Sequence, residues 1–174
     1  MHKLYLGGSE QRKFARQIFV SMEITAPMYW LMQFDTYKIG VSSNGSSKMH
    51  KLLHKAFDID DFSYEHMTSE GISVLYIIIY NLNKLRDEYM NFDDLKSEGK
   101  IASNISKQDI WNTILDLLPD SYNQTRYVSM NYENVFNMIN QRQNHKLDEW
   151  KQFTYTLYKL PYVSEIMDGD KPRF

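Results

Sequence analysis

Apolar residues recur along the chain with two different periods, and each period predicts a type of element. Over residues 17–24 apolar and polar positions nearly alternate, which predicts a strand with one buried face. Residues 124–130 are rich in β-formers and predict a second strand. Over residues 69–90 apolar side chains recur at helical spacing, which predicts the longest helix. The unbroken apolar middle of this segment predicts burial on most of its sides.

Capping residues and helix breakers mark the ends of further helices. Pro27 fits the first turn of a helix over 27–34, and Asn131 can cap a helix over 131–142. Ser106 and Asp109 form a capping-box pattern, and Pro119 ends the helix that follows. We also expect helices over 49–57 and 147–160, and loops over 37–47 and 91–104.

These elements define the expected fold class and domain organisation. Helices predominate and no strand–helix–strand alternation recurs, so we expect an α+β fold, mostly helical, with a small antiparallel or mixed sheet. The chain has 174 residues, enough for one core, and no repeat or linker interrupts it. We therefore expect a single domain over residues 1–174.

Composition excludes several classes of site and partner. The chain has 0 cysteines, which excludes disulfides, cysteine-ligated metals and thiol catalysis. A formal net charge of −2 gives no general attraction to nucleic acid or anionic membranes. The longest apolar run is too short to span a bilayer, and the first residues lack a stretch of signal-peptide length. We therefore expect a cytoplasmic protein with no nucleic-acid partner and no membrane partner.

Metal-binding and phosphate-binding patterns are weak. The sequence contains no glycine-rich dinucleotide fingerprint, no P-loop and no zinc-protease motif. His50 and His54 could share a helix face, but the sequence places no third ligand beside them. Asp58, Asp60 and Asp61 form an acidic run of the kind usually found in solvated loops. The sequence therefore predicts no metal site.

Aromatic residues make up 14% of the chain, which is high. Such content is typical of a ring-rich core or of an interface between copies of the chain. It would also suit surfaces that stack on the rings of a nucleotide or cofactor. Both interpretations remain open from composition alone.

Residues 118–152 carry an ordered series of features: a Leu-Pro pair, an expected strand, a helix-opening asparagine, a second asparagine six positions on, and an arginine five further. A histidine and a tryptophan follow. The residues in this series are Leu118, Pro119, Asn131, Asn137, Arg142, His145 and Trp150. Together with residues 24–52, the series resembles the flavin-dependent thymidylate synthases, with the histidine and the tryptophan each displaced by one position.

Residues 24–52 resemble the same family in shape and less in chemistry. An Ala-Pro pair and Gln33 stand where the family has Ala-Pro and a glutamine at the nucleotide. The family signature R-H-R-x-x-S-x-N-E-x-S-x-R-Y aligns with residues 36–49, where only Ser46 is identical. Its opening Arg-His-Arg becomes Thr-Tyr-Lys, ending at Lys38, and Asn44 replaces the glutamate. Lys48 keeps the charge of the later arginine.

The resemblance implies a fold, an activity and a set of binding residues. It implies synthesis of dTMP from dUMP, with methylenetetrahydrofolate as carbon donor, FAD as hydride carrier and NADPH as reductant, in a homotetramer with shared flavin sites. No protein nucleophile is required, so no catalytic residue is assigned. The implied cofactor-binding residues are Lys38, Asn131, Asn137, Arg142 and His145. The implied substrate-binding residues are Gln33, Asn44, Ser46, Lys48 and Arg142.

Two alternatives to this activity remain. An arginine that the family uses for the substrate phosphate is replaced by Leu115, and the opening Arg-His-Arg is lost. Both changes favour a non-catalytic relative that holds a flavin or nucleotide on the same fold. A third hypothesis is an interaction protein whose aromatic surfaces pack only against its own copies.

The chemistry of the same residues supports two local hypotheses. Residues 42–47, Ser-Ser-Asn-Gly-Ser-Ser, with Lys38 and Lys48 beside them, predict either a phosphate cradle or a surface turn. Asn131 and Arg142 lie roughly 20° apart around the expected helix, with Asn137 to one side. They form either a flavin-binding face or an ordinary helix cap and surface arginine. His145 is either part of that site or an exposed histidine at a helix end.

Overall fold

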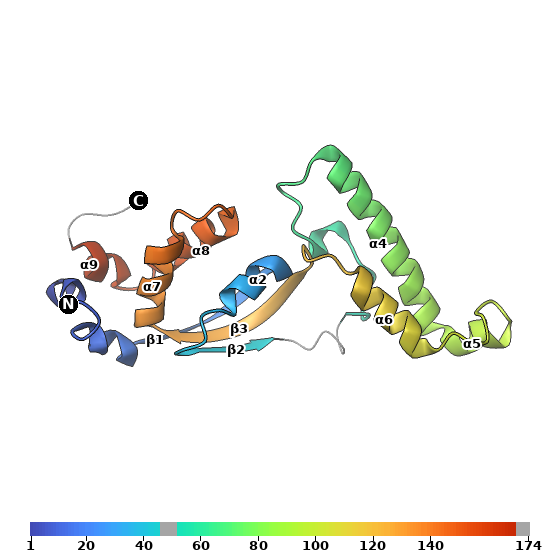
Figure 1. Ribbon diagram of the computed structural model, residues 1–174, viewed down its shortest axis with the longest axis horizontal. Helices are drawn as coiled ribbons and strands as arrows, with labels where there is room; N and C mark the ends of the chain where they lie inside the picture. The colour runs from blue at the N-terminus through green and yellow to red at the C-terminus, as the bar shows by residue number, and fades with distance from the viewer. Residues whose placement is uncertain (46–51, 170–174) are drawn as a thin grey trace. The chain divides into compact units, whose positions relative to one another are not determined.

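The computed structural model describes residues 1–45 and 52–169, shown in Figure 1. The chain divides into two compact units. Unit 1 comprises Met1–Ala26, Trp30–Gly45 and the chain from Thr125 onward, and unit 2 comprises Pro27–Tyr29 and Ser46–Gln124.

Most of the elements lie wholly or mainly in unit 1, while Pro27–Tyr29 and the first residues of β3 belong to unit 2. In chain order they are α1 (His2–Leu6), the 3-10 helix η1 (Arg12–Gln17), β1 (Phe19–Pro27), α2 (Met28–Phe34), β2 (Val41–Gly45), β3 (Asn123–Asn131), α7 (Tyr132–Arg142), α8 (Asp148–Tyr158) and α9 (Val163–Asp168). Unit 2 contains the 3-10 helix η2 (Ile59–Asp61), α4 (Ser69–Met90), α5 (Phe92–Ser97) and α6 (Lys107–Leu117). The expected α+β class, mostly helical with a small sheet, is confirmed.

The sheet of unit 1 has three strands in the order β1-β3-β2. β2 and β3 pair antiparallel, with Val41 opposite Met130. The alternation expected for a half-buried sheet is present in β3, because Val128 and Met130 are buried whereas Tyr127 and Ser129 are exposed. In Figure 1 helices α2 and α7 lie over the same side of the sheet.

β2 corrects the sequence analysis, which expected a loop over residues 37–47. Residues Val41–Gly45 form an edge strand although serine, asparagine and glycine favour turns. Pairing with β3 supplies the backbone hydrogen bonds that the local sequence does not favour, so tertiary context overrides local preference.

Other element boundaries also differ from the expected ones. β1 continues through Pro27, so α2 begins one residue later than expected. The expected loop over 91–104 contains α5, and the sequence analysis missed α1, η1 and α9. The helix expected over 49–57 lies partly outside the described residues, and residues 52–57 are not helical: 52–55 form turns and bends, and 56–57 have no regular structure.

The capping predictions are confirmed. Asn131 precedes α7 and accepts a hydrogen bond from the backbone N–H of Asn134 at 3.1 Å. Ser106 and Asp109 form a reciprocal capping box at the start of α6. Both arrangements satisfy backbone donors that the first turn of a helix leaves without a partner.

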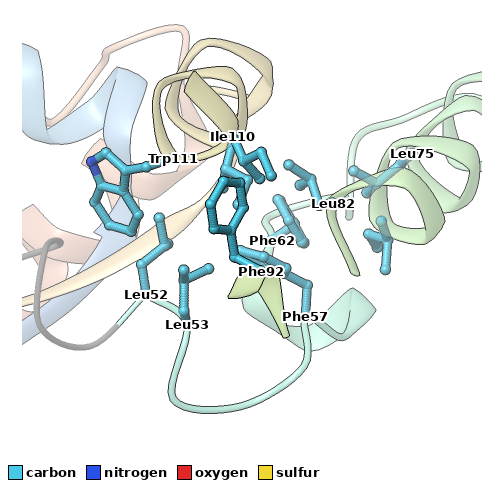
Figure 2. Close-up of a cluster of buried hydrophobic side chains, with 11 residues drawn as sticks. Leu52, Leu53, Phe57, Phe62, Leu75, Leu82, Phe92, Ile110 and Trp111 are labelled. Atoms are coloured by element: carbon cyan, nitrogen blue, oxygen red, sulfur yellow. The ribbon is translucent and has the colours of Figure 1, made fainter. Parts of the chain in front are cut away.

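The core of unit 2 lies against one side of α4. Its apolar side chains come from α4, α5, α6 and residues 52–62 (Figure 2). The buried members are Leu52, Leu53, Phe57, Phe62, Leu75, Ile79, Leu82, Phe92, Ile110, Trp111 and Ile114. α4 has the expected bounds, but the prediction that it is buried on most sides is wrong: Ile77 is 61% and Tyr80 is 71% exposed.

The acidic run in unit 2 has a structural role. Asp58 caps η2 by accepting a hydrogen bond from the backbone N–H of Asp60 at 3.3 Å. Asp61 completes the capping box and pairs with Lys55 at 2.7 Å. Across residues 1–45 and 52–169, no three histidine, aspartate or glutamate side chains gather as a metal site. In the same ranges, no helix is long and apolar enough to cross a membrane.

Candidate functional site

A cluster of aromatic rings joins α2 to α8 in unit 1. The rings of Trp30 and Trp150 lie 4.6 Å apart between centroids, and both are buried. Phe34 stacks on Trp30 at 5.3 Å. Tyr37, in the loop after α2, lies 6.0 Å from Trp150 and is only half-buried. The cluster therefore runs from the core of unit 1 to its surface.

Arg142, the last residue of α7, lies at the surface end of this cluster. Its Nε donates to the Tyr37 hydroxyl at 3.1 Å, and its guanidinium carbon is 4.9 Å from the centroid of the Trp150 ring. The Tyr37 hydroxyl in turn donates to Oε1 of Gln141 at 2.9 Å. The two rings and the hydrogen bond hold the guanidinium in one orientation. Its two terminal nitrogens have no partner among the described residues, so they can bind an anion with two parallel hydrogen bonds.

Gln33 is held on the other side of Trp150. The indole N–H of Trp150 donates to Oε1 of Gln33 at 2.9 Å. This bond fixes the orientation of the amide and leaves its NH2 group as a donor. Gln33 is half-buried, so this donor can contact a bound ligand.

His145 follows α7 and packs its ring edge against Trp150, with 6.2 Å between centroids. Its Nδ1 accepts the backbone N–H of Leu147 at 3.1 Å, so the neutral ring carries its proton on Nε2. Burial lowers the pKa of His145 from its ordinary value, and the charges of Arg142 and Lys146 lower it further. At neutral pH the side chain is therefore an uncharged donor beside a fixed cation.

A second polar group supports the start of α7. Nδ2 of Asn134 donates to the carbonyl of Gly40 and to Oδ1 of Asn131, each at 3.1 Å. Gly40 has a positive φ of +74°, and a Cβ there would lie 2.7 Å from Asn134 Nδ2. These contacts join the segment before β2 to α7. The Asn131 side chain is therefore occupied in capping α7 and in binding Asn134.

The residues proposed from the sequence fall into three groups. Gln33, Arg142 and His145 come together around Trp150. Lys38 and Asn44 are exposed, and no side-chain contact joins them to Trp150 or Arg142. Asn137 is half-buried on α7, Asn131 lies in the capping group, and Ser46 and Lys48 lie outside the described residues.

The two hypotheses for residues 42–47, a phosphate cradle or a surface turn, can be judged only as far as Gly45. Residues 42–45 lie in β2, where the backbone pairs with β3 and not in a turn. Lys38 precedes this strand and Lys48 is outside the described residues. The described part therefore has the geometry of an edge strand, not of a loop around an anion.

Sequence reasoning did not include two residues at the centre of the cluster. Trp150 was noted only in the series after β3, and Tyr37 only as a departure from the family signature. Both contact the Arg142 guanidinium. The sequence offered one chemical signal for them: the faces of tyrosine and tryptophan rings attract cations, and Arg142 lies near Trp150 in the sequence.

Comparisons with known proteins give a fold. No family model and no curated protein matches the chain. Two solved structures of the flavin-dependent thymidylate synthase ThyX from Helicobacter pylori, both with FAD and dUMP, match with a TM-score of 0.55 and 16% identity. The match covers 93% of this chain and 84% or 83% of the other. At this identity the similarity shows a shared fold, which agrees with the resemblance found in the sequence.

Proposed function

We propose that this protein is a flavin-dependent thymidylate synthase-like protein that binds FAD through the Arg142 end of the aromatic cluster. The observation that carries the proposal is the guanidinium of Arg142, fixed by Tyr37 and Trp150 with two nitrogens free for an anion. The solved ThyX structures, which contain FAD, support the choice of ligand.

The residues of the cluster fit a flavin dinucleotide. Its pyrophosphate needs a fixed cation, which Arg142 supplies in a bidentate orientation. Its ring system needs aromatic surface and directional donors, which Tyr37, Gln33 and neutral His145 supply. When bound, the flavin supplies hydride chemistry, and the protein binds and orients it.

The activity that such a site would serve is methylation of dUMP to dTMP, with methylenetetrahydrofolate and NADPH as co-substrates. The position where the family has a phosphate-binding arginine is Leu115, whose side chain packs against the apolar core of unit 2. An apolar side chain cannot hold a phosphate, and this observation favours the alternative, a flavin-binding relative without synthase activity. In either case we propose that the chain forms a homo-oligomer, a tetramer in the synthase hypothesis.

Flavin titration tests the binding proposal. FAD added to the purified chain should bind with a measurable Kd, followed by flavin fluorescence. Arg142→Ala should weaken binding by about 10-fold to 100-fold, as expected for charge-assisted hydrogen bonds. Circular dichroism should remain unchanged, since a surface arginine contributes little to stability.

Arg16→Ala is the matched control. It removes the same charge from η1 in the same unit, where Arg16 pairs with Glu133. FAD affinity should not change in this variant. Absence of FAD uptake by the unmodified chain at high micromolar concentration would refute the proposal. If FAD binds, formation of dTMP from dUMP in the complete assay distinguishes the synthase from its non-catalytic alternative.

A further inference from the structure

The side of α4 opposite the unit 2 core is apolar and exposed. Val74, Ile77 and Tyr80 are 54%, 61% and 71% exposed. At 100° per residue, positions 70, 73, 74, 77, 80, 81 and 84 all lie within roughly 60° of Ile77. We call these seven positions the outward face of α4. Leu75, Ile79 and Leu82 lie on the opposite side and enter the core.

This outward face is long, regular and without a partner among the described residues. In the described part of the chain α4 packs mainly against α5, α6 and η2, and its buried residues Leu75, Ile79 and Leu82 lie on the core side. Three large apolar side chains on consecutive turns of one helix are more than scattered surface residues, and such patches are typical of protein interfaces. Tyrosine is among the residue types enriched there.

The charges on the outward face identify its partner. Glu70 lies seven residues before Ile77 and Lys84 lies seven residues after it, and neither forms an ion pair with the described residues. If two copies of α4 pack antiparallel about a two-fold axis at Ile77, each Glu70 meets the Lys84 of the other copy. A parallel arrangement would instead bring like charges together, which is unfavourable.

The polar and apolar positions agree with the same register. The adjacent residues Ser73 and Val74 lie before Ile77, and Tyr80 and Asn81 lie after it at a similar distance. In the antiparallel register, one such pair faces the other, and Ile77 meets its own copy. Apolar groups therefore meet at the centre and charges meet at both ends, as in a self-complementary interface.

We propose that the outward face of α4 binds the same face of a second copy of this chain, antiparallel and centred on Ile77. This proposal names the surface through which the chain would self-associate. It rests only on the homo-oligomer of the proposed function. It does not depend on flavin binding, because Arg142 and the aromatic cluster belong to unit 1.

Disruption of the centre of the face is the first test. Light scattering at about 10–100 µM covers the range in which weak dimers form. In this range Ile77→Lys should halve the mass of the assembly. It should also raise the dissociation constant for self-association about 30-fold or more. The control is Leu117→Lys, which changes a 50% exposed leucine of α6 and should leave the mass unchanged. The proposal is overturned if the unmodified chain is monomeric at about 100 µM, roughly ten times a low-micromolar Kd. It is also overturned if Ile77→Lys leaves the mass unchanged.

Charge exchange tests the register. Glu70→Lys and Lys84→Glu should each weaken association, because each places like charges at both ends of the interface. The double variant should restore the affinity of the unmodified chain. Equal weakening in the double variant would overturn the antiparallel register.

Disulfide formation tests the geometry directly. The chain has 0 native cysteines, so an introduced cysteine can pair only with its own copy. Ile77→Cys should form a covalent dimer on mild oxidation, since facing helices bring this position within disulfide distance of its own copy. Ser73→Cys, on the same face four residues away, should not. Cross-linking of both variants to the same extent would overturn the proposal.

FAD uptake measured on the same samples separates this inference from the flavin proposal. Association that responds to these variants, in a chain that takes up no FAD, supports the interface and refutes flavin binding. FAD uptake by a chain that stays monomeric supports flavin binding and refutes the interface.

Discussion

Replacing Gly40 with alanine should destabilise unit 1 by more than its backbone conformation alone requires. Gly40 has φ +74°, a region in which an L-residue costs about 1 kcal/mol. The new Cβ would also lie 2.7 Å from Asn134 Nδ2 and 2.8 Å from Asn131 Nδ2, closer than real contacts allow. Both amides must then move, which weakens the cap of α7, itself worth about 1 kcal/mol. We expect a total loss of about 2 to 3 kcal/mol.

Urea unfolding measured by tryptophan fluorescence can isolate this effect. In a Trp111→Phe background the remaining tryptophans, Trp30 and Trp150, both lie in unit 1. The matched control is Gly8→Ala, because Gly8 has φ +90° with no atom within 4 Å of the added Cβ. It should lose only the backbone cost of about 1 kcal/mol.

A double-mutant cycle separates the two contributions. Asn134→Ala removes the nearest clashing atom together with the hydrogen bond to the Gly40 carbonyl. The losses from Gly40→Ala and Asn134→Ala should therefore not add, because both act on one contact. If Gly40→Ala costs no more than Gly8→Ala, the steric argument is wrong.

Two further predictions concern titrating groups. Arg142→Gln should raise the pKa of His145 but leave it below 6.5, because burial lowers it more than the charge does; NMR titration measures both values. Stability should fall as the pH drops from about 6.5 toward the folded pKa, since the unfolded chain binds that proton more tightly. Ser106→Ala should cost about 1 kcal/mol of unfolding free energy through the lost cap. Hydrogen bonds from Ser106 hold the pKa of Asp109 below 3.8, so the same change should raise this pKa. The variant should then lose less stability on acidification than the unmodified chain does. An unchanged titration of the Asp109 carboxyl would contradict the capping role of Ser106.

Helix ends were predictable where a side chain near the helix start determines them. Asn131 and Ser106 each accept a backbone N–H within three residues, so the signal lies within one turn of sequence. α4 was predictable for the same reason, with Thr68 accepting the N–H of Gly71 at 3.2 Å. Local chemistry of this kind does not depend on the rest of the fold.

β2 and the exposure of α4 could not be predicted in this way. β2 consists of turn-forming residues that become a strand only because β3 lies beside them, more than 80 positions later in the chain. In α4, Ile77 and Leu75 are both large and apolar, and the positions of α5, α6 and residues 52–62 decide which one is buried. Pairing and burial are properties of contacts distant in sequence, and apolar composition alone does not state which side of a helix has a partner.

The candidate site combines both situations. The series after β3 directed attention to Arg142 and His145, which lie three positions apart at the end of α7. Their orientation, however, comes from Tyr37 and Trp150, which belong to segments on either side of α7 in sequence. The sequence could therefore supply the charged group, whereas only the fold supplies the rings that fix it.

The placement of cations bears directly on which ligand the fold can hold. A phosphate dianion carries two negative charges, and the described site offers one fixed cation, the Arg142 guanidinium. At the position where the family resemblance would supply a second cation, the chain has Leu115, which packs against the core of unit 2. A flavin differs from dUMP because it adds a large ring system to its phosphates, and the site offers aromatic surface and neutral donors for such a system. Flavin binding and dTMP synthesis are therefore separate proposals, because a fold that keeps a site for a cofactor need not keep the site for its substrate.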